Sequence, residues 1–294
     1  MTLPATLLLG FIAGATILLG LPVGRLRKPA PSLRLLLNAA AVGVLLFLVW
    51  DVLSAAWEPI DAALSSISEG KSGLGTAAGY GALFAAGLVV GLGALVAYER
   101  WMQRQVRARP ADTPRIQGLG AMTVGEVKPP RGLASWSSAR RLSLLIAVGI
   151  GLHNFAEGLA IGQSAASGAI ALALMLVIGF GLHNATEGFG IVAPLAADVD
   201  DDGQPRRPSW PLLLTLGAIG GGPTFVGTVI GYSFTSEPLS VAFLTLAAGS
   251  LLYVITQLIG VAARAKRSDL LACGILIGLL AGFLTDAIVT AGGV

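Results

Sequence analysis

Long apolar runs separated by shorter polar stretches dominate the chain. A helix needs about 20 apolar residues to cross the hydrocarbon core of a bilayer, which is about 30 Å thick. Runs of this kind are found at 3–23, 35–55, 76–98, 141–162, 169–193, 210–233, 239–262 and 269–291. The pattern therefore predicts an all-α, polytopic membrane protein with eight transmembrane helices, which form a single transmembrane domain over residues 1–294.

Polar side chains interrupt these apolar runs at only a few places. Asp51 closes the run 35–55, and Asp286 lies within the run 269–291. Two interpretations stay open for these carboxylates, namely stations along an ion pathway or groups that reach the lipid headgroups. Asn38 and Gln257 also lie inside apolar runs, and each is expected to hydrogen-bond a neighbouring helix.

Glycine is unusually frequent, with 40 residues, and many glycines are spaced four apart. Gly274, Gly278 and Gly282, for example, would share one face of a helix, where small residues let two helices approach closely. The three glycines 220–222 stand directly before Pro223, and proline removes a backbone hydrogen bond from a helix. The sequence therefore predicts close helix packing and a break near the middle of the run 210–233.

Composition supports a location in the bilayer. The chain is 54% hydrophobic and only 12% charged, with a mean hydropathy of +0.79, whereas soluble domains carry about 25% charged residues. No Lys or Arg precedes Arg25, so the run 3–23 is interpreted as a retained first span and not as a signal peptide. With a single cysteine, Cys273, the chain can form no internal disulfide and no metal site with four thiolate ligands.

The basic residues lie almost entirely on one side of the predicted spans. All but one of the 19 Lys and Arg residues fall in the connections after the first, third, fifth and seventh runs, and the exception is Lys71. By the positive-inside rule, these connections face the cytoplasm and both termini lie outside. The longest of them, 99–140, mixes Arg, Pro, Gly and Ser and is expected to be a flexible cytoplasmic loop. An acidic cluster formed by Asp198 and residues 200–202 is interpreted as a solvated turn.

Both histidines of the chain lie in nearly the same hexapeptide, HNFAEG at 153–158 and HNATEG at 183–188, deep inside two consecutive spans. Within each motif the His, Asn and Glu side chains project from one helical face, because residues three and four apart are neighbours. The two helices are expected to be antiparallel, with a short connection at 163–168, so the motifs can meet near the bilayer midplane. The candidate metal ligands are His153, Asn154, Glu157, His183, Asn184 and Glu187.

Charge neutralisation favours a metal at this place. An isolated carboxylate in hydrocarbon costs several kcal/mol or more and needs a cation, water or a metal. Apart from Arg141, at the first position of the run 141–162, no Lys or Arg lies inside the predicted spans to pair with Glu157 or Glu187. Nitrogen and oxygen donors without thiolate suit Zn²⁺ first, while Fe²⁺, Mn²⁺, Co²⁺, Ni²⁺ and Cd²⁺ also fit. The alternative, that each motif only hydrogen-bonds between helices, explains a single motif better than a matched pair.

At these motifs the sequence resembles the ZIP (Zrt/Irt-like) family of divalent-metal transporters, in a form like that of its bacterial members. The resemblance covers essentially the whole chain: eight spans, outward termini, a long third connection and paired HNxxEG motifs on spans four and five. The stretch LAAGSLLYVITQLIG at 246–260 is also similar to the seventh span of that family. The resemblance implies an elevator-type carrier, in which one group of helices moves the site across the membrane.

The resemblance also implies a binuclear site, from which this sequence departs in several ways. His153, Glu157, His183 and Glu187 would surround one metal, and Asn154, Asn184 and the shared glutamates a second. Ala156 and Thr186 stand where many members have proline, Gln257 replaces a common acidic residue, and the acidic ligand of span six is replaced near Gly222. The departures affect the second position, so one metal is a firmer expectation than two.

The sequence thus predicts a transporter that moves a divalent ion, zinc first, into the cytoplasm by alternating access, without an organic cofactor and without a nucleic-acid partner. An enzyme is not expected, because HNxxE lacks the glutamate that follows the first histidine in the HExxH metallohydrolases. An intramembrane metallohydrolase and a membrane metal sensor remain the alternatives. A bacterial inner membrane is the expected location, and the assembly of two chains into a homodimer stays open.

Overall fold

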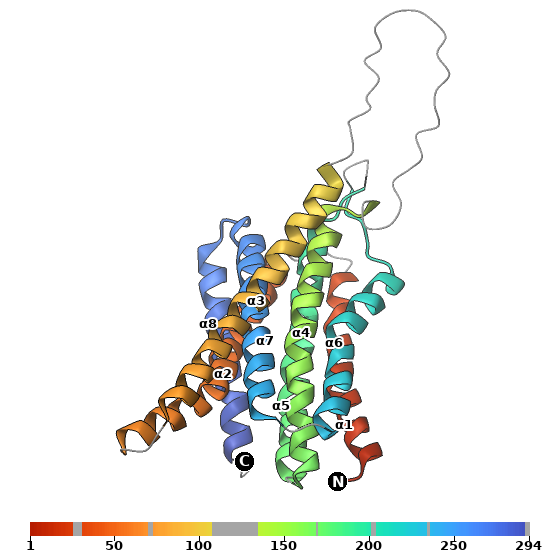
Figure 1. Cartoon of the computed structure of the whole chain (residues 1–294). Helices are drawn as coiled ribbons and strands as arrows, with labels where there is room; N and C mark the ends of the chain where they lie inside the picture. Colours follow the sequence, from red (N-terminus) through yellow and green to blue (C-terminus); the bar gives the residue numbers. More distant parts are fainter. Residues whose placement is uncertain are drawn as a thin grey trace, which may run out of the picture.

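The computed structural model describes residues 1–25, 31–69, 73–107, 135–168, 170–200, 204–233 and 236–291. Throughout these ranges the regular elements are helices, and no strand is present (Figure 1). They are α1 (Leu3–Ala15), α2 (Pro31–Ser68), α3 (Leu74–Arg107), α4 (Ser138–Ala166), α5 (Ile170–Val192), α6 (Trp210–Ser233), α7 (Glu237–Ala263) and α8 (Ser268–Ala291). Short 3₁₀ turns, η1 (Thr16–Leu19) and η2 (Leu21–Arg25), extend α1, and η4 (Ala193–Ala197) extends α5.

Eight helical segments of the described chain are long and apolar enough to cross a membrane. The predicted all-α, multi-pass membrane fold is therefore confirmed. The longest extensions beyond the predicted spans are those of α2, which continues to Ser68, and of α3, which continues to Arg107. The first nine residues of the predicted loop 99–140 are helical, because helix-forming residues such as Glu, Arg, Met and Gln extend α3 past its apolar part. Residues 108–134 of that loop, like Lys71, lie outside the described ranges.

The helices form two groups that pack side by side (Figure 1). The first, here the motif bundle, contains α1, α4, α5 and α6, with α4 packed most closely on α6. The second, here the partner bundle, contains α2, α3, α7 and α8, in which α2 packs on α8 and α3 on α7. The two bundles meet where α4 contacts α7 and where α5 contacts α2 and α8. Both HNxxEG motifs therefore belong to one bundle and lie against the other.

Both chain termini lie at the same end of the molecule, here the terminal end (Figure 1). The Tyr232 hydroxyl, one residue before the end of α6, donates a hydrogen bond of 3.0 Å to the Met1 carbonyl. α3 ends and α4 begins at the opposite end, here the loop end. The outward orientation of the termini stays a prediction from the positions of the basic residues.

The expected break in α6 is wrong, because α6 is continuous from Trp210 to Ser233 with Pro223 inside it. Proline frees the carbonyl four residues earlier, that of Ile219. This carbonyl lies against Gly151 of α4, so closely that a side chain at that position would overlap it. Close packing of α4 on the Cα of Gly151 covers the freed carbonyl, and the helix needs no break.

Close helix packing at glycine is confirmed. A side chain at Gly278 of α8 would overlap the backbone of Ala40 on α2, and one at Gly282 would overlap the Phe47 ring. The motif glycines behave in the same way: Gly158 lies against the backbone of Thr224 on α6, and Gly188 against the backbone at Gly20. Glycine after each motif glutamate thus lets the site helices approach their neighbours.

Of the polar residues outside the motifs, Asn38 has the contact that was expected, whereas Gln257 and Asp198 do not. Asn38 donates a hydrogen bond of 3.1 Å to the Leu258 carbonyl of α7, as expected. Gln257 is half-buried, and in the described part of the chain its side chain has no hydrogen-bond partner, which corrects the expectation for it. The Asp198 carboxylate is buried and lies 2.9 Å from Nε of Arg140, so it is not part of a solvated turn. An arginine at the start of α4 supplies the charge that lets this aspartate leave water.

Candidate metal centre

α4 carries the first motif on a face that is enclosed by the other helices. His153 is 1% exposed, Asn154 0% and Glu157 4%, so none of these polar groups is solvated by bulk water. The helix passes between α6 of its own bundle and α7 of the partner bundle. A polar face at this position requires partners from within the protein, or an ion.

Three side chains of the two motifs converge on one point. Nε2 of His153 lies 3.0 Å from Oε1 of Glu157, and Nε2 of His183 on α5 contacts the same oxygen. One donor atom from each of the three residues lies within 4.8 Å of the others. Ligands around a tetrahedral zinc ion are about 3.4 Å apart, given bonds of about 2.1 Å. The three residues are therefore close enough to share a metal ion, for which the contacting atoms of His183 and Glu157 would move apart to that spacing.

The contact of His153 with Glu157 has the distance of a hydrogen bond without its direction. Both ring nitrogens of His153 lack a hydrogen-bond partner, although Nε2 is so close to the carboxylate oxygen. The i,i+4 spacing on α4 brings the two groups together, and the poor alignment leaves Nε2 of His153 available to an ion. The same arrangement leaves Oε2 of Glu157 without a partner.

Glu187 lies beside this group and is joined to it through Asn154. Its Oε2 accepts a hydrogen bond of 3.1 Å from Nδ2 of Asn154, which also donates to the Gly220 carbonyl of α6 at 3.0 Å. Oε1 of Glu187 and Oδ1 of Asn154 are buried without a partner. The amide thus positions the second carboxylate, and its own oxygen remains available as a ligand.

Asn184 uses its amide nitrogen to hold α1. Nδ2 donates a hydrogen bond of 3.1 Å to the Ala13 carbonyl, while Oδ1 is buried without a partner. The structure therefore brings His153, Glu157 and His183 into one group, places Glu187 next to them through Asn154, and ties Asn184 to α1. Buried polar atoms are nearly always satisfied in native proteins. Unpartnered oxygens on four of the six predicted ligands are what a bound cation or water would satisfy.

A cavity of about 400 Å³ reaches His183 from between α2, α5 and α8. Its wall includes Asp51, Asp286, Thr186 and Phe180. The two aspartates came from different apolar runs in the sequence, and the structure places both on this wall. Phe180 was not predicted to be part of the site. Its ring centroid lies 5.5 Å from that of His183. In the sequence, only its position three residues before His183 on the same helix face indicates that it lies near the site.

Packed apolar side chains separate the site from the loop end of the molecule. Ile150 lies three residues before His153 on α4, and Ile191 lies four residues after Glu187 on α5, in both cases on the loop-end side. Both are 0% exposed and belong to the largest apolar cluster of the described residues, together with Leu216 of α6. The site is thus approached by a cavity from one side and covered by packed side chains on the other.

The sequence matches no protein-family model and no curated protein.

Proposed function

We propose that this protein is a carrier of divalent metal ions, similar in kind to the ZIP transporters that the paired motifs resemble. The observation that supports the proposal most is the buried group of His153, Glu157 and His183, contributed by two adjacent helices of a multi-pass membrane protein. Ionisable groups inside a membrane protein are functional far more often than structural. A cation supplies the charge that two buried glutamates need, since their partners in the described segments are the two histidines and the Asn154 amide, and no Lys or Arg contacts them.

The donor set favours zinc as the transported ion. Imidazole nitrogen and carboxylate oxygen are typical ligands of Zn²⁺ and also bind Fe²⁺, Mn²⁺ and Cd²⁺. The only thiol, that of Cys273, is exposed on α8 and lies outside the group. Moderate affinity suits a carrier, since the cargo must leave again. We propose one metal bound by His153, Glu157 and His183 with Glu187 adjacent, and a second position at the oxygens of Asn154, Asn184 and Glu187.

The cavity provides the route by which the ion reaches the site. Asp51 and Asp286 on its wall would attract a cation and replace part of its hydration shell on the way to His183. If the positive-inside orientation holds, this cavity opens away from the cytoplasm, and the conformation is the one that receives metal from outside. The expected membrane is the bacterial inner membrane.

Alternating access needs a change that opens the loop end and closes the terminal end. The division into two bundles supports a movement of the motif bundle against the partner bundle, because the site residues are carried by α4 and α5 while α2 and α8 supply the opposite cavity wall. In this proposal Ile150 and Ile191 separate from the partner bundle or from each other, and the metal is released into the cytoplasm.

Transport assays on the purified protein test the proposal. Reconstituted into vesicles that contain a zinc-sensitive dye, the protein should give zinc influx that saturates with concentration and is absent from protein-free vesicles. Zinc binding without influx would indicate a metal sensor, and zinc-dependent hydrolysis of membrane peptides without influx would indicate a metallohydrolase. Either result would contradict a carrier.

A further inference from the structure

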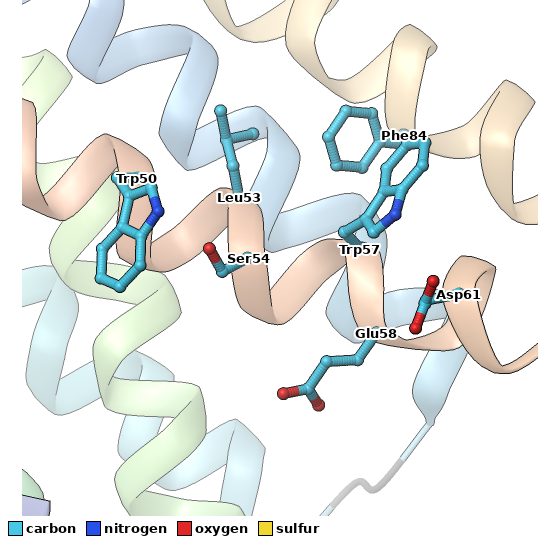
Figure 2. Close-up of a pocket in the computed structure, with 7 residues that line it drawn as sticks. All are labelled: Trp50, Leu53, Ser54, Trp57, Glu58, Asp61 and Phe84. Carbon is cyan, nitrogen blue, oxygen red and sulfur yellow. The ribbon is translucent and has the colours of Figure 1, made fainter.

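A second cavity, of about 670 Å³ and wide open to the surface, lies on the outside of the partner bundle between α2 and α3. It shares no lining residue with the cavity at His183. Its walls are formed by Trp50, Leu53, Ser54, Trp57, Glu58, Asp61 and Phe84 (Figure 2). All of these except Phe84 lie on α2 at spacings of three and four, so they form one continuous face of that helix.

The depth of this cavity follows from its neighbours. The Tyr80 hydroxyl of α3 donates a hydrogen bond of 2.8 Å to the carboxylate of Glu237, which is the first residue of α7. Phe84 lies four residues further along α3, about 6 Å along the axis of that helix and away from its start at Leu74. The Trp57 ring meets the Phe84 ring edge to face, with centroids 5.3 Å apart. The two rings therefore lie just inside the level at which α7 begins, where aromatic side chains mark the border of hydrocarbon and headgroups.

The two charged residues of the cavity lie together at one end of it. Asp61 and Glu58 are nearest the end of α2 at Ser68, Trp57 follows beside Phe84, and Ser54, Leu53 and Trp50 lie further back along the helix (Figure 2). From Asp61 to Trp50 the face is about 16 Å long. This order of negative charge, aromatic ring and apolar surface matches a lipid with a positively charged headgroup.

The carboxylates at the mouth have no partner among the residues that the structure describes. Glu58 and Asp61 are one helical turn apart, and both are exposed. Neither has a hydrogen bond or an ion pair with another residue in the described part of the chain. Trp57 is 45% exposed beside them, so an ammonium group at the carboxylates would also lie near an aromatic face.

We propose that this cavity binds a phospholipid with an ethanolamine headgroup from the leaflet at the terminal end. The ammonium group donates hydrogen bonds to Glu58 and Asp61 and contacts the Trp57 ring, while the acyl chains extend along Leu53 and Trp50. Two carboxylates at the mouth repel a lipid with net negative charge. The primary ammonium of ethanolamine has three N–H donors, which two adjacent carboxylates can accept.

Lipid binding to the purified full-length protein tests this site. Delipidated protein in detergent is titrated with phosphatidylethanolamine or with phosphatidylglycerol of the same acyl chains, and retained lipids are counted by native mass spectrometry. We expect binding of phosphatidylethanolamine to be about tenfold tighter than that of phosphatidylglycerol. The double change Glu58→Gln and Asp61→Asn should remove this preference, and Glu69→Gln, which makes the same kind of change outside the cavity, should keep it.

A second variant and a second measurement distinguish loss of the lipid site from misfolding of the double variant. Trp57→Leu retains both carboxylates and should weaken phosphatidylethanolamine binding roughly threefold. Brominated acyl chains should quench tryptophan fluorescence in the wild-type protein more than in the double variant. Equal binding of the two lipids, an unchanged preference in the double variant, or equally tight binding of soluble phosphoethanolamine would overturn the proposal. A cross-link that joins this face of α2 to the same face in a second chain, with no lipid retained between them, would also overturn the proposal.

Discussion

Glu157 is the side chain on which the two motifs meet. Its Oε1 lies next to Nε2 of both histidines, whereas Glu187 reaches the group through the Asn154 amide. Motif symmetry alone would assign the two glutamates equal roles. The structure instead ranks Glu157 above Glu187 as a ligand.

This ranking can be measured with zinc. Glu157→Gln keeps the size of the side chain but removes its charge and its metal ligand, so zinc affinity should fall by more than about 100-fold. Glu187→Gln should cost about 10- to 100-fold. Asp286→Asn, on the cavity wall, should leave most of the affinity unchanged. Calorimetric titration of zinc into the three variants gives the ranking, and wild-type affinity in Glu157→Gln would exclude the proposed site.

Metal binding at this site should depend on pH. The His183 nitrogen lies against the Glu157 oxygen, so the metal-free protein needs a proton between them, and an arriving ion must displace it. Protons compete with the metal, and apparent affinity should therefore fall as the pH drops from about 7.5 to about 5.5. About one to two protons should be released per ion, which titration in buffers of different ionisation enthalpy counts. Affinity that is independent of pH, with no proton release, would contradict this chemistry.

At the residue scale, the sequence predicted which side chains would gather but not how each would be used. The spacing of His153 and Glu157 predicts a shared face, and their contact follows from it. The hydrogen bond of Asn184 to the Ala13 carbonyl depends on the position of α1, which no local pattern contains. The burial of Asp198 likewise depends on Arg140, 58 residues earlier in the chain.

Among the elements, α4 and α6 form the closest pair, and their contact positions the first motif. Gly158 directly follows Glu157, and its Cα lies against the backbone of Thr224. Because backbone atoms cannot turn aside as a side chain can, even one methyl group would push the two helices apart. The glycine of the HNxxEG motif therefore has a packing role in this protein.

Two alanine substitutions test this contact. Gly158→Ala should lower the free energy of unfolding by about 1–3 kcal/mol, because the added Cβ overlaps α6. Gly222→Ala, with no atom within 4 Å of the added Cβ, should have little effect or stabilise by less than about 1 kcal/mol. Thermal unfolding of both variants in the same detergent gives the comparison. Equal stability of the two variants would show that the contact is looser than described.

At this scale the sequence predicted the number of helices, because apolar length is a local property. It failed at Pro223, where the local rule of a broken helix was overridden by the contact of the Ile219 carbonyl with Gly151. It also placed the end of α3 nine residues too early, since a hydrophobic run marks only the part of a helix that lies in lipid.

For the whole molecule, the distribution of basic residues predicts which end faces the cytoplasm. With Cys273 replaced by serine, a single cysteine at Ser236, at the terminal end, should react with a membrane-impermeant reagent added outside cells. A cysteine at Ser135, next to the start of α4 at the loop end, should react only after the membrane is permeabilised. The reverse pattern would invert the direction of transport proposed here.

The division into two bundles could not be predicted from the sequence. Helices that are neighbours in the chain often lie in different bundles, as α1 and α2 do, and the grouping depends on contacts such as those of α4 with α6. The cavity at His183 has the same origin, because its wall combines residues of α2, α5 and α8. Long-range packing thus determines the route to a site whose ligands a local motif had predicted.

The coordination of bound zinc tests the central claim most directly. X-ray absorption at the zinc edge should show only nitrogen and oxygen ligands at about 2.0–2.2 Å, with the scattering pattern of two imidazole rings. Replacement of both His153 and His183 by Gln should remove the imidazole signal and most of the bound zinc. A sulfur ligand, or zinc retained with unchanged coordination in the double variant, would contradict the account.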